Sequence, residues 1–411
     1  MKLWNITITA QSPLVFPVRK PGAQFRASLP YVPGAVLYGA LGEALARAGR
    51  FDAEFMRAVR CHNAYPAAPG DPWVRPLPLS AATPKGADRP ADTLVARVCW
   101  EVLQPAALIY APTDKSGRAW ETVSGFYAPP HDDDARKQTA RGVAQRVMTR
   151  VSINRRRGTA EDQRLYSFLA ISEVNTFTRH RWNEQGYEED AAQSFATLFL
   201  GSVVSRDNVD LAPLLAQIDQ VGGRITTGMG EVAVQAQETT PEDGQVIQRR
   251  IAQMTERFRA SAARYARLRP TRDWQPDGAI FTVNLLSDAI LYEDGWRPTT
   301  TLIAEMLREA SGIQAELRLL RSFAQPDVAG GWNVVWPGPK PTEVSTQRGA
   351  VFVFQASHGL TDDDYQRLAD LQLDGIGERR AEGYGQVRIC DEFHLDDSYQ
   401  LDYRQFLEEQ P

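Results

Sequence analysis

The first residues of the chain alternate between apolar and polar side chains. Trp4, Ile6 and Ile8 fall on one face of an extended segment, and polar residues fall on the other. This period of two predicts a half-buried β-strand. After the Pro-Gly pair at 33–34 the apolar residues recur at helical spacing, which predicts a helix over residues 35–48.

The same succession of patterns occurs twice along the chain. The first half continues with two strand-like runs, an apolar run that fits either a strand or a helix, and a short helix (150–154, 164–174, 195–204 and 211–218). The second half shows a strand, a helix, three strand-like runs and a helix (280–286, 299–309, 317–323, 334–336, 351–354 and 362–371). Each half ends in a glycine-rich turn and a strand, which indicates an internal duplication. This order predicts an α+β protein with two tandem ferredoxin-like units of the type β-α-β-β-α-β.

Domain boundaries follow from this duplication. We expect an N-terminal domain over residues 1–236, enlarged by an insertion at about 60–160, and a C-terminal domain over residues 276–411. Residues 237–275 lie between them and hold one long helical pattern at 246–268. At 1.5 Å per residue this helix is about 35 Å long, which suits a connection between two domains.

Composition excludes several classes of protein. Hydrophobic residues make up 43% and charged residues 24% of the chain, which is typical of a folded protein rather than a disordered one. No apolar run is long enough to cross a membrane, and the N-terminus lacks a secretory core. Three scattered cysteines form neither a disulfide framework nor a metal motif. We therefore expect a cytoplasmic protein without membrane association.

The net charge of −5 is unevenly spread. Residues 135–164 carry nine arginine or lysine residues against two acids, so this segment has a net charge of +7. Such a segment on an acidic body favours local binding of a polyanion. The alternative is a solvated basic loop that pairs with acidic neighbours such as Asp132, Asp133 and Asp134. Charge alone does not separate these two interpretations.

Glycines are closely spaced at equivalent places in the two halves. Gly228-Met229-Gly230 in the first half corresponds to Gly383-Tyr384-Gly385 in the second, and further glycines and arginines precede both. Such glycines permit positive φ angles and can expose N–H groups in a concavity that suits a phosphate. The alternative is a tight turn into an edge strand. If the functional interpretation holds, valine at Gly383 or Gly385 leaves the protein folded but impairs retention of the polyanion.

Signatures of catalysis are weak. The five histidines are isolated, no phosphate-binding loop of the GxxxxGK[ST] type occurs, and no nucleophile elbow is present. The run from His131 to Asp134 reads as a solvated loop rather than a metal site. Asp114, Asp288 and Asp294 are conceivable as single catalytic aspartates, but a lone aspartate is weak evidence. We expect a non-catalytic protein with no metal and no cofactor.

Three sequence segments together resemble the RAMP superfamily of CRISPR-associated proteins. They are YVPGAVLYGALGEAL near the N-terminus, MTRVSINRRRGTAEDQRLYSFLAISEV at 148–174, and the duplicated glycine-rich loop. The segment 149–174 is the most specific and resembles the tandem-RAMP subunit of type III-D effector complexes. The chain departs from the family pattern at Leu37, Tyr38 and Met229, where the family often has serine-type, arginine and aromatic residues.

The resemblance implies a subunit of a ribonucleoprotein used in antiviral defence. It implies ferredoxin-like (RRM-like) domains that hold the guide (CRISPR) RNA near its 5′ handle through loops, with target RNA contacted indirectly. The implied protein partners are other RAMP subunits and the large polymerase-like subunit of a type III complex. Arginine suits RNA contact because its planar group pairs with phosphate and stacks on unpaired bases.

The residues expected to bind RNA come from the basic segment and from the two glycine-rich loops. They are Arg146, Arg150, Arg155, Arg156, Arg157, Arg164, Arg224, Gly228, Gly230, Gly375, Gly377, Arg379, Arg380, Gly383, Tyr384 and Gly385. Tyr384 could stack on a base or pack against its own domain. Three other functions stay open: a backbone RAMP subunit that cleaves target RNA through a metal-assisted loop aspartate, a repeat-RNA processing endonuclease, and a protein-only scaffold.

Overall fold

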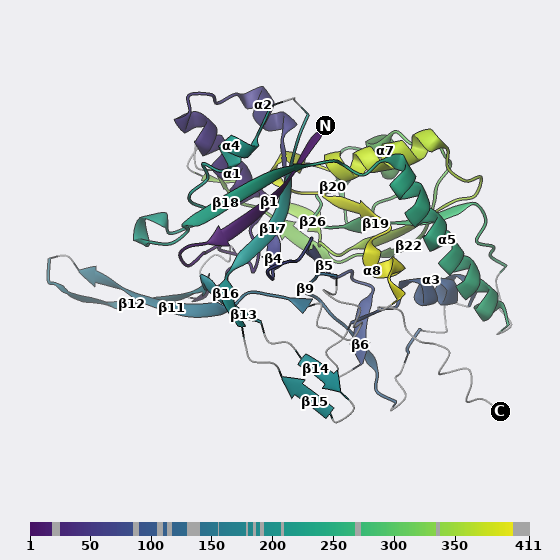
Figure 1. Ribbon diagram of the computed structural model, residues 1–411, viewed down its shortest axis with the longest axis horizontal. Coiled ribbons are helices and arrows are strands. Elements are labelled where there is room, and N and C mark those ends of the chain that lie inside the picture. Colours follow the sequence, from purple (N-terminus) through teal and green to yellow (C-terminus); the bar gives the residue numbers. More distant parts are fainter. Residues whose placement is uncertain are drawn as a thin grey trace.

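Two antiparallel sheets lie side by side, and a long insertion reaches from the first to the second (Figure 1). The structure is a computed structural model of the 411-residue chain. It describes residues 1–18, 25–84, 90–104, 110–112, 117–129, 140–154, 156–177, 180–183, 186–189, 193–206, 209–267, 273–333 and 338–397. The mixture of helices and sheets confirms the expected α+β class.

The first sheet has the strand order β18-β1-β17-β3, and β4 also pairs with β17. Its strands are β1 (Lys2–Ala10), β3 (Arg60–Cys61), β4 (Tyr65–Ala67), β17 (Leu198–Ser205) and β18 (Val232–Thr239). All neighbouring strands are antiparallel. Trp4, Ile6 and Ile8 are buried in the core as the alternation predicts. The run at 195–204, which fitted either a strand or a helix, forms strands.

The helices of the first half cover one face of this sheet. They are α1 (Gly34–Arg47), α2 (Ala53–Ala58) and α4 (Ala212–Leu215). Helix α1 matches the predicted helix to within one residue at each end. Leu37, Leu41 and Leu45 repeat at four-residue spacing along α1, so they form one apolar stripe that packs into the core of the first sheet.

The second sheet repeats the arrangement with the order β22-β27-β19-β28. Its strands are β19 (Ala279–Leu285), β22 (Arg318–Phe323), β27 (Val351–Ala356) and β28 (Val387–Ile389). The four strands of each half can be numbered by their order in the sequence, with β3 as the second strand of the first sheet. The spatial order is then 4-1-3-2 in both sheets. Alternation predicts that β19 buries one face, yet all seven of its residues are buried. The second face is covered as well, because Asn284 bonds to His394, which in turn contacts Asp92 of the insertion.

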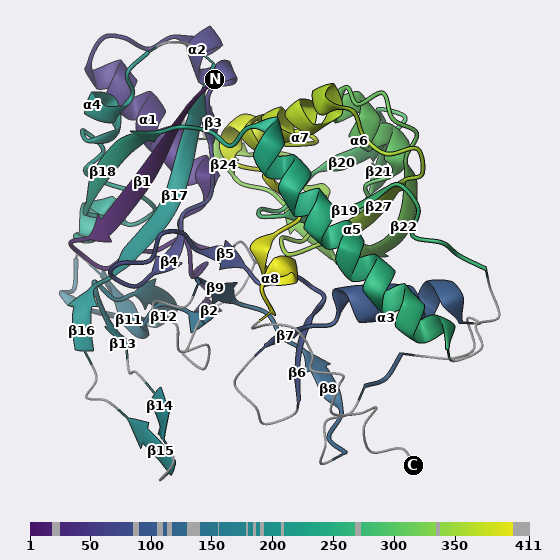
Figure 2. The ribbon, with the colours of Figure 1, turned by 45° about the vertical axis from the view of Figure 1, so that its right-hand side comes forward.

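The helices of the second half include the one expected to connect two domains. They are α5 (Gly244–Ala266), α6 (Ala304–Ser311), α7 (Asp362–Asp374) and α8 (Glu392–Leu395). Helix α5 is not an isolated connector. Ile251, Met254 and Phe258 on α5 are buried in the core of the second half, and α5 runs across that half beside α7 (Figure 2).

The segment between β4 and β17 comprises residues 68–197 and overlaps the insertion expected at about 60–160. Its elements are β5 (Arg75–Pro76), β6 (Ala81–Pro84), β7 (Ala91–Asp92), α3 (Leu94–Leu103), β8 (Trp120–Thr122), β9 (Phe126–Tyr127), β10 (Ala140–Arg141), β11 (Gln145–Asn154), β12 (Thr159–Ile171), β13 (Val174–Phe177), β14 (His180–Asn183), β15 (Gly186–Glu189) and β16 (Gln193–Ala196). Helix α3 packs against α5, and Leu94, Val98 and Cys99 join the core of the second half. The insertion therefore links the two sheets.

Short elements complete the fold. They are β2 (Phe25–Arg26), β20 (Leu291–Glu293), β21 (Arg297–Thr299), β23 (Pro326–Ala329), β24 (Trp332–Asn333), β25 (Gly338–Pro339), β26 (Glu343–Thr346), and the 3-10 turns η1 (Ile225–Thr227) and η2 (Arg380–Glu382). The predicted strand at 334–336 lies outside the described residues. None of the helices in the described ranges is long and apolar enough to cross a membrane.

Candidate nucleic-acid interface

The two glycine-rich loops have the same backbone conformation. Residues 219–232 align with residues 374–387 without a gap, at an offset of 155 residues. Positive φ angles occur at four shared positions, which are Gly222, Arg224, Gly228 and Gly230 in the first loop and Gly377, Arg379, Gly383 and Gly385 in the second. The second loop has a fifth at Gly375, whose equivalent in the first loop is Gln220. The turns η1 and η2 occupy equivalent places between them. The duplication inferred from the glycines therefore extends to the backbone conformation of the loop.

The hydrogen bonds that close the loops also correspond. The N–H of Val221 donates to the carbonyl of Gly230 at 2.8 Å, and the N–H of Ile376 donates to that of Gly385 at 2.9 Å. A serine hydroxyl then accepts the N–H at the start of the last strand in each half. Ser12 does so in the first half at 2.9 Å and Ser287 in the second at 2.8 Å. Because these donors are already satisfied, they do not form an open phosphate cradle.

Most of the loop glycines are required by the fold itself. A Cβ atom on Gly385 would lie 1.8 Å from the carbonyl oxygen of Ile376, and one on Gly377 would lie 2.2 Å from that of Ile290. Gly230 and Gly375 face backbone atoms at 2.7 and 2.8 Å in the same way. This corrects the expectation, made with the phosphate-cradle interpretation, that valine is tolerated at Gly385. Gly228 differs, because no atom of the described residues lies within 4 Å of its Cβ position.

The second loop is covered by the first half of the chain. A Cβ on Gly383 would lie 2.4 Å from the carbonyl oxygen of Cys61 and 2.9 Å from the Cα of Gly34, the first residue of α1. Valine at Gly383 would therefore push the two halves apart, which corrects the expectation that it is tolerated. The guanidinium of Arg379 lies 4.8 Å from the ring centre of Tyr384. Tyr384 therefore contacts its own domain.

The arginines of the second loop are neutralised within the protein. Arg379 pairs with Glu382 at 2.7 Å and with Glu343 at 3.4 Å. Arg380 pairs with Asp374 at 2.6 Å. Burial raises the pKa of Glu382, but the nearby cations Arg379 and Lys340 outweigh the effect of burial and hold this pKa below its usual range. The second loop is therefore a structural element of the junction, with little free positive charge.

The first loop faces solvent beside the hairpin β11–β12. Residues 225–228 are exposed, whereas Met229 is buried against Phe168 of β12. The guanidinium of Arg224 lies 3.8 Å from the ring centre of Phe168 and 5.2 Å from that of Tyr166. Arg224 is thus held by aromatic rings rather than by a carboxylate in the described part of the chain, so its charge is not cancelled by an ion pair there.

The hairpin β11–β12 projects from the body of the molecule and has two distinct faces (Figure 1). Cross-strand pairing sets these faces, because directly opposite residues in a sheet point to the same side. On one face Arg150 lies opposite Tyr166, and Met148 lies opposite Phe168. The other face is aliphatic and exposed, and includes Val147, Val151 and Leu165. Phe168 is buried on this face, so its accessible part combines Arg150 with the half-buried ring of Tyr166. An arginine beside an aromatic ring is also found on surfaces that bind single-stranded RNA.

The positive charge of this segment is smaller than the sequence suggests. Arg141 is buried and forms two bonds of 2.7 Å to Asp71, and Arg146 pairs with Glu173 at 2.8 Å. Arg150, Arg156 and Arg157 are exposed. Arg155, the side chain of Arg164 and the acidic run at 132–134 lie outside the described residues. The three exposed arginines and Arg224 form what we call the hairpin surface.

Two of the aspartates considered for catalysis lie among the described residues. Asp288 accepts the N–H of Arg348 at 2.8 Å and pairs with its guanidinium at 3.5 Å, while burial raises the pKa of Asp288. Asp294 occupies an exposed turn next to Arg297. Asp114 and the run beginning at His131 lie outside the described residues. In the described ranges no three potential metal ligands come together.

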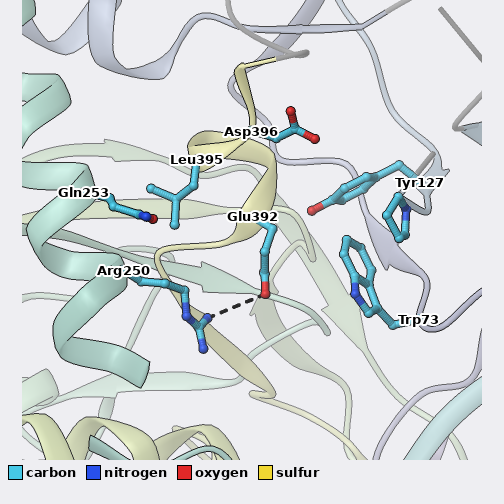
Figure 3. A pocket seen from close by; sticks show the side chains of 8 residues that line it. Trp73, Tyr127, Arg250, Gln253, Glu392, Leu395 and Asp396 are labelled. Carbon is cyan, nitrogen blue, oxygen red and sulfur yellow. Dashed lines mark ion pairs between the residues drawn. The ribbon is translucent and has the colours of Figure 1, made fainter. Parts of the chain in front are cut away.

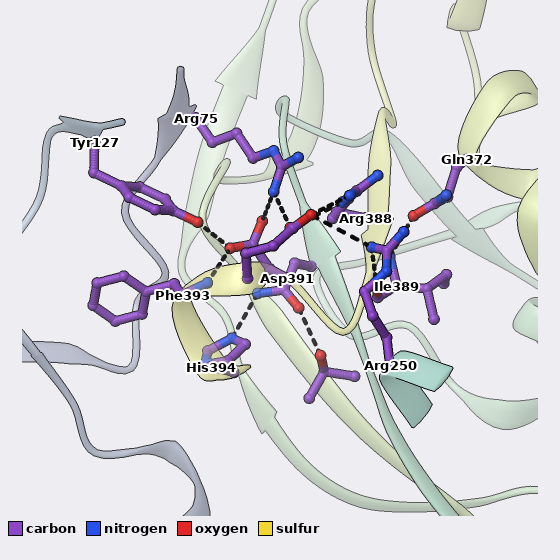
Figure 4. Close-up of polar contacts among 12 residues, drawn as sticks. Arg75, Tyr127, Arg250, Gln372, Arg388, Ile389, Asp391, Phe393 and His394 are labelled. Atoms are coloured by element: carbon purple, nitrogen blue, oxygen red, sulfur yellow. Dashed lines mark hydrogen bonds and ion pairs between the residues drawn. The ribbon is translucent and has the colours of Figure 1, made fainter. Parts of the chain in front are cut away.

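Sequence reasoning missed a polar network between the insertion and the end of the second half (Figure 4). Tyr127 donates to Asp391, and Arg75 pairs with Asp391 at 3.3 Å and also with Glu392. His394 joins this region to the insertion through its bond of 2.9 Å to Asp92. These partners are about 300 residues apart in sequence, and no local pattern marks them.

A cavity of about 370 Å³ lies beside this network (Figure 3). Trp73 and Tyr127 of the insertion form one wall, and Arg250 of α5 and Glu392 of α8 form the other. These side chains are the ones that join the insertion to the second half, and Arg75 stacks over the Trp73 ring at 4.0 Å. The cavity therefore belongs to this junction and not to either glycine-rich loop.

Comparison with known proteins gives only distant similarities. No family model matches the chain, and no curated protein sequence does. Among solved structures, a chain of the type III-B Cmr-beta bound to cognate target RNA and AMPPnP aligns at 10% identity with a TM-score of 0.42 over 85% of this chain and 86% of that chain. A chain of the type III-B Cmr-beta bound to cognate target RNA aligns at 11% identity with a TM-score of 0.39 over 85% of this chain and 86% of that chain. A chain of the type III-B Cmr-beta in the apo state aligns at 10% identity with a TM-score of 0.29 over 57% of this chain and 96% of that chain. Similarities this low do not assign a function.

Proposed function

We propose that the protein is a non-catalytic RNA-binding subunit of a type III CRISPR effector ribonucleoprotein. The observation that carries this proposal is the hairpin surface. Arg150 lies opposite the half-buried Tyr166, Arg224 lies over the rings of Tyr166 and Phe168, and Arg156 and Arg157 are exposed in the turn at the tip of the hairpin. The hairpin lies within the segment whose sequence most resembles the type III-D subunit. Phosphate contacts from arginine supply affinity, and aromatic rings accept unstacked bases.

The proposal assigns different roles to the glycine-rich loops of the two halves. The second glycine-rich loop has its arginines paired with carboxylates and its Gly383 packed against the start of α1, so it supports the fold. The first loop leaves Arg224 on the rings of β12 and thereby extends the positive surface of the hairpin. RNA binding is therefore assigned to the first half, although the sequence motifs occur in both.

Replacing Arg150, Arg156 and Arg157 with alanine is expected to weaken RNA retention. Each arginine that neutralises a phosphate of a single strand adds about 0.7 to the steepness of log affinity against log salt, so removing three such arginines flattens the slope by about 2. Binding to single-stranded RNA at several salt concentrations measures this slope. A matched control removes three exposed arginines elsewhere, Arg249, Arg308 and Arg318. Equal slopes in both triple variants would show that RNA does not lie on the hairpin.

The proposed location of this subunit near the 5′ handle of the guide RNA leads to a second prediction. If this subunit holds the repeat-derived tag, the assembled complex should bind tagged guide RNA more tightly than a scrambled strand of equal length and base composition. Discrimination needs unpaired bases that contact side chains, and the half-buried Tyr166 provides an aromatic ring for such a contact. Competition between the two RNAs for the complex measures the preference. Equal affinity would instead favour a subunit from the backbone of the complex.

A further inference from the structure

The junction between the two halves contains two kinds of contact. The first is the close approach of Gly383 in the second loop to Gly34 and Cys61. The second is electrostatic, because Asp374 at the end of α7 pairs with Arg60 at 2.9 Å and with Arg206 at 2.7 Å, both from the first half. These arginines and Arg380 overcome the effect of burial and hold the pKa of Asp374 below its usual range. A glycine turn and an aspartate of the second half thus dock onto the first.

The first half has an equivalent glycine turn and an equivalent aspartate, but neither is covered by another part of the described chain. Gly228 is the equivalent of Gly383, and no described atom lies within 4 Å of its Cβ position. Asp219 is the equivalent of Asp374, and its side chain is 65% exposed, with an ion pair of 3.3 Å to Arg47 of its own half. Ile225 at the start of the turn between them is 38% exposed. The docking surface that the second half uses is therefore repeated in the first half and faces solvent.

We propose that this surface, formed by Asp219 and residues 225–228, docks onto the start of the first helix of a neighbouring β-α-β-β-α-β subunit. The partner is expected to present a glycine at the start of that helix and an arginine near the second strand, as Gly34 and Arg60 do within this chain. The inference rests on the proposed function, because it places that subunit in the same effector complex.

The chemistry of the surface favours protein over RNA. The turn presents Ile225, Thr226 and Thr227, which carry no charge, and Asp219 is negative. A phosphate backbone is attracted by cations and repelled by a carboxylate, whereas an exposed isoleucine gains from burial against a protein. The hairpin surface and the docking surface are therefore adjacent but chemically distinct.

A second copy of this chain does not fit as the occupant. The start of α1 in each copy is already covered by the second loop of the same chain. The corresponding helix of the second half, α6, begins with Ala304 rather than with a glycine such as Gly34, whose lack of a side chain allows the backbone contact. The neighbour is therefore a different chain. Contact between unlike surfaces is heterologous, so successive units stack head to tail.

Site-specific cross-linking in the assembled complex tests this docking directly. The three cysteines Cys61, Cys99 and Cys390 are all buried, so Thr226→Cys introduces one exposed thiol. A benzophenone maleimide attached there is irradiated in the effector complex purified from its source cells, and the products are mapped by mass spectrometry. We expect cross-links to the first helix of another protein subunit. Cross-links only to RNA, only to a second copy of this chain, or only to other regions would overturn the proposal.

A charge reversal supplies the second measurement. Asp219→Arg is expected to reduce the amount of the neighbouring subunit recovered per copy of this chain at least tenfold, because the introduced guanidinium would meet the partner's arginine. Glu256→Arg, on an exposed part of α5, makes the same charge change away from the surface. Melting curves of both variants confirm that each is folded. Equal recovery of the neighbour from the two variants would contradict the docking.

The two proposals fail in different ways. A complex that keeps the cross-link at position 226 but retains RNA after removal of the three hairpin arginines refutes the RNA-binding proposal alone. A complex that releases RNA without those arginines but gives no cross-link to another subunit refutes the docking alone. RNA binding by the isolated Asp219→Arg variant should not fall below that of the unmodified chain, because Asp219 is not part of the hairpin surface and the substitution adds positive charge.

Discussion

Gly385→Val should strongly destabilise the protein, whereas Gly228→Val should leave it folded. Both glycines have positive φ angles, of 70° and 78°, so a β-branched residue costs about 1–2 kcal/mol of backbone strain at either position. Only Gly385 also has a carbonyl oxygen 1.8 Å from the Cβ position, and such overpacking adds roughly 1–3 kcal/mol. Thermal and urea unfolding of the two variants measures the difference.

The pair of variants separates a structural role from a functional one. Gly385→Val should unfold several degrees below Gly228→Val, with reduced soluble yield. Gly385→Ala removes the β-branching and keeps the clash, so it should still fall below Gly228→Ala. Equal melting temperatures at the two positions would mean that the second loop relaxes freely. In that event the phosphate-cradle interpretation of this loop would regain its basis.

Arg75→Met should also cause a large loss of stability. Arg75 is buried between Asp391 and Glu392, and Asp391 itself is 1% exposed. Removing one partner of a buried ion pair leaves an uncompensated charge, which typically costs about 3–5 kcal/mol. Denaturant unfolding should therefore show a lower midpoint, and the insertion should become susceptible to proteolysis because Arg75 joins it to α8.

Two further variants test whether the destabilisation comes from the buried charge. Arg75→Met combined with Asp391→Asn removes both charges and should recover part of the stability, since the neutral amide still accepts the hydrogen bond from Tyr127. Arg297→Met breaks an exposed pair with Glu293 and should cost no more than about 1 kcal/mol. A double variant as unstable as the sum of its single variants would show that Arg75 and Asp391 act independently.

Local periodicity predicted much of the fold. The alternation of Trp4, Ile6 and Ile8 and the helical stripe of α1 are set by residues near one another in sequence, so they are visible without a structure. The duplicated glycine motif likewise located both loops. These features depend on backbone conformation and on one buried face, and a short stretch of sequence specifies both.

The environment of the candidate site could not be predicted in the same way. Nothing near Gly383 in sequence indicates that Gly34 lies against it, and Arg379 and Arg380 are neutralised by carboxylates brought in by the fold. The sequence counts Arg141 among the basic residues of the segment 135–164 but does not show that it is buried, because its partner Asp71 is 70 residues away. Long-range pairing determines which charges remain available for RNA.

The position of α3 has a consequence for the order in which the chain can fold during synthesis. Its apolar residues Leu94, Val98 and Cys99 emerge early from the ribosome, yet they are buried only against α5 and the second sheet. The first sheet must also wait for β17 and β18, which follow the insertion. Because contacts of such long range close late, the early segments stay exposed while translation continues. Neither half can therefore reach its final packing until most of the chain has been made.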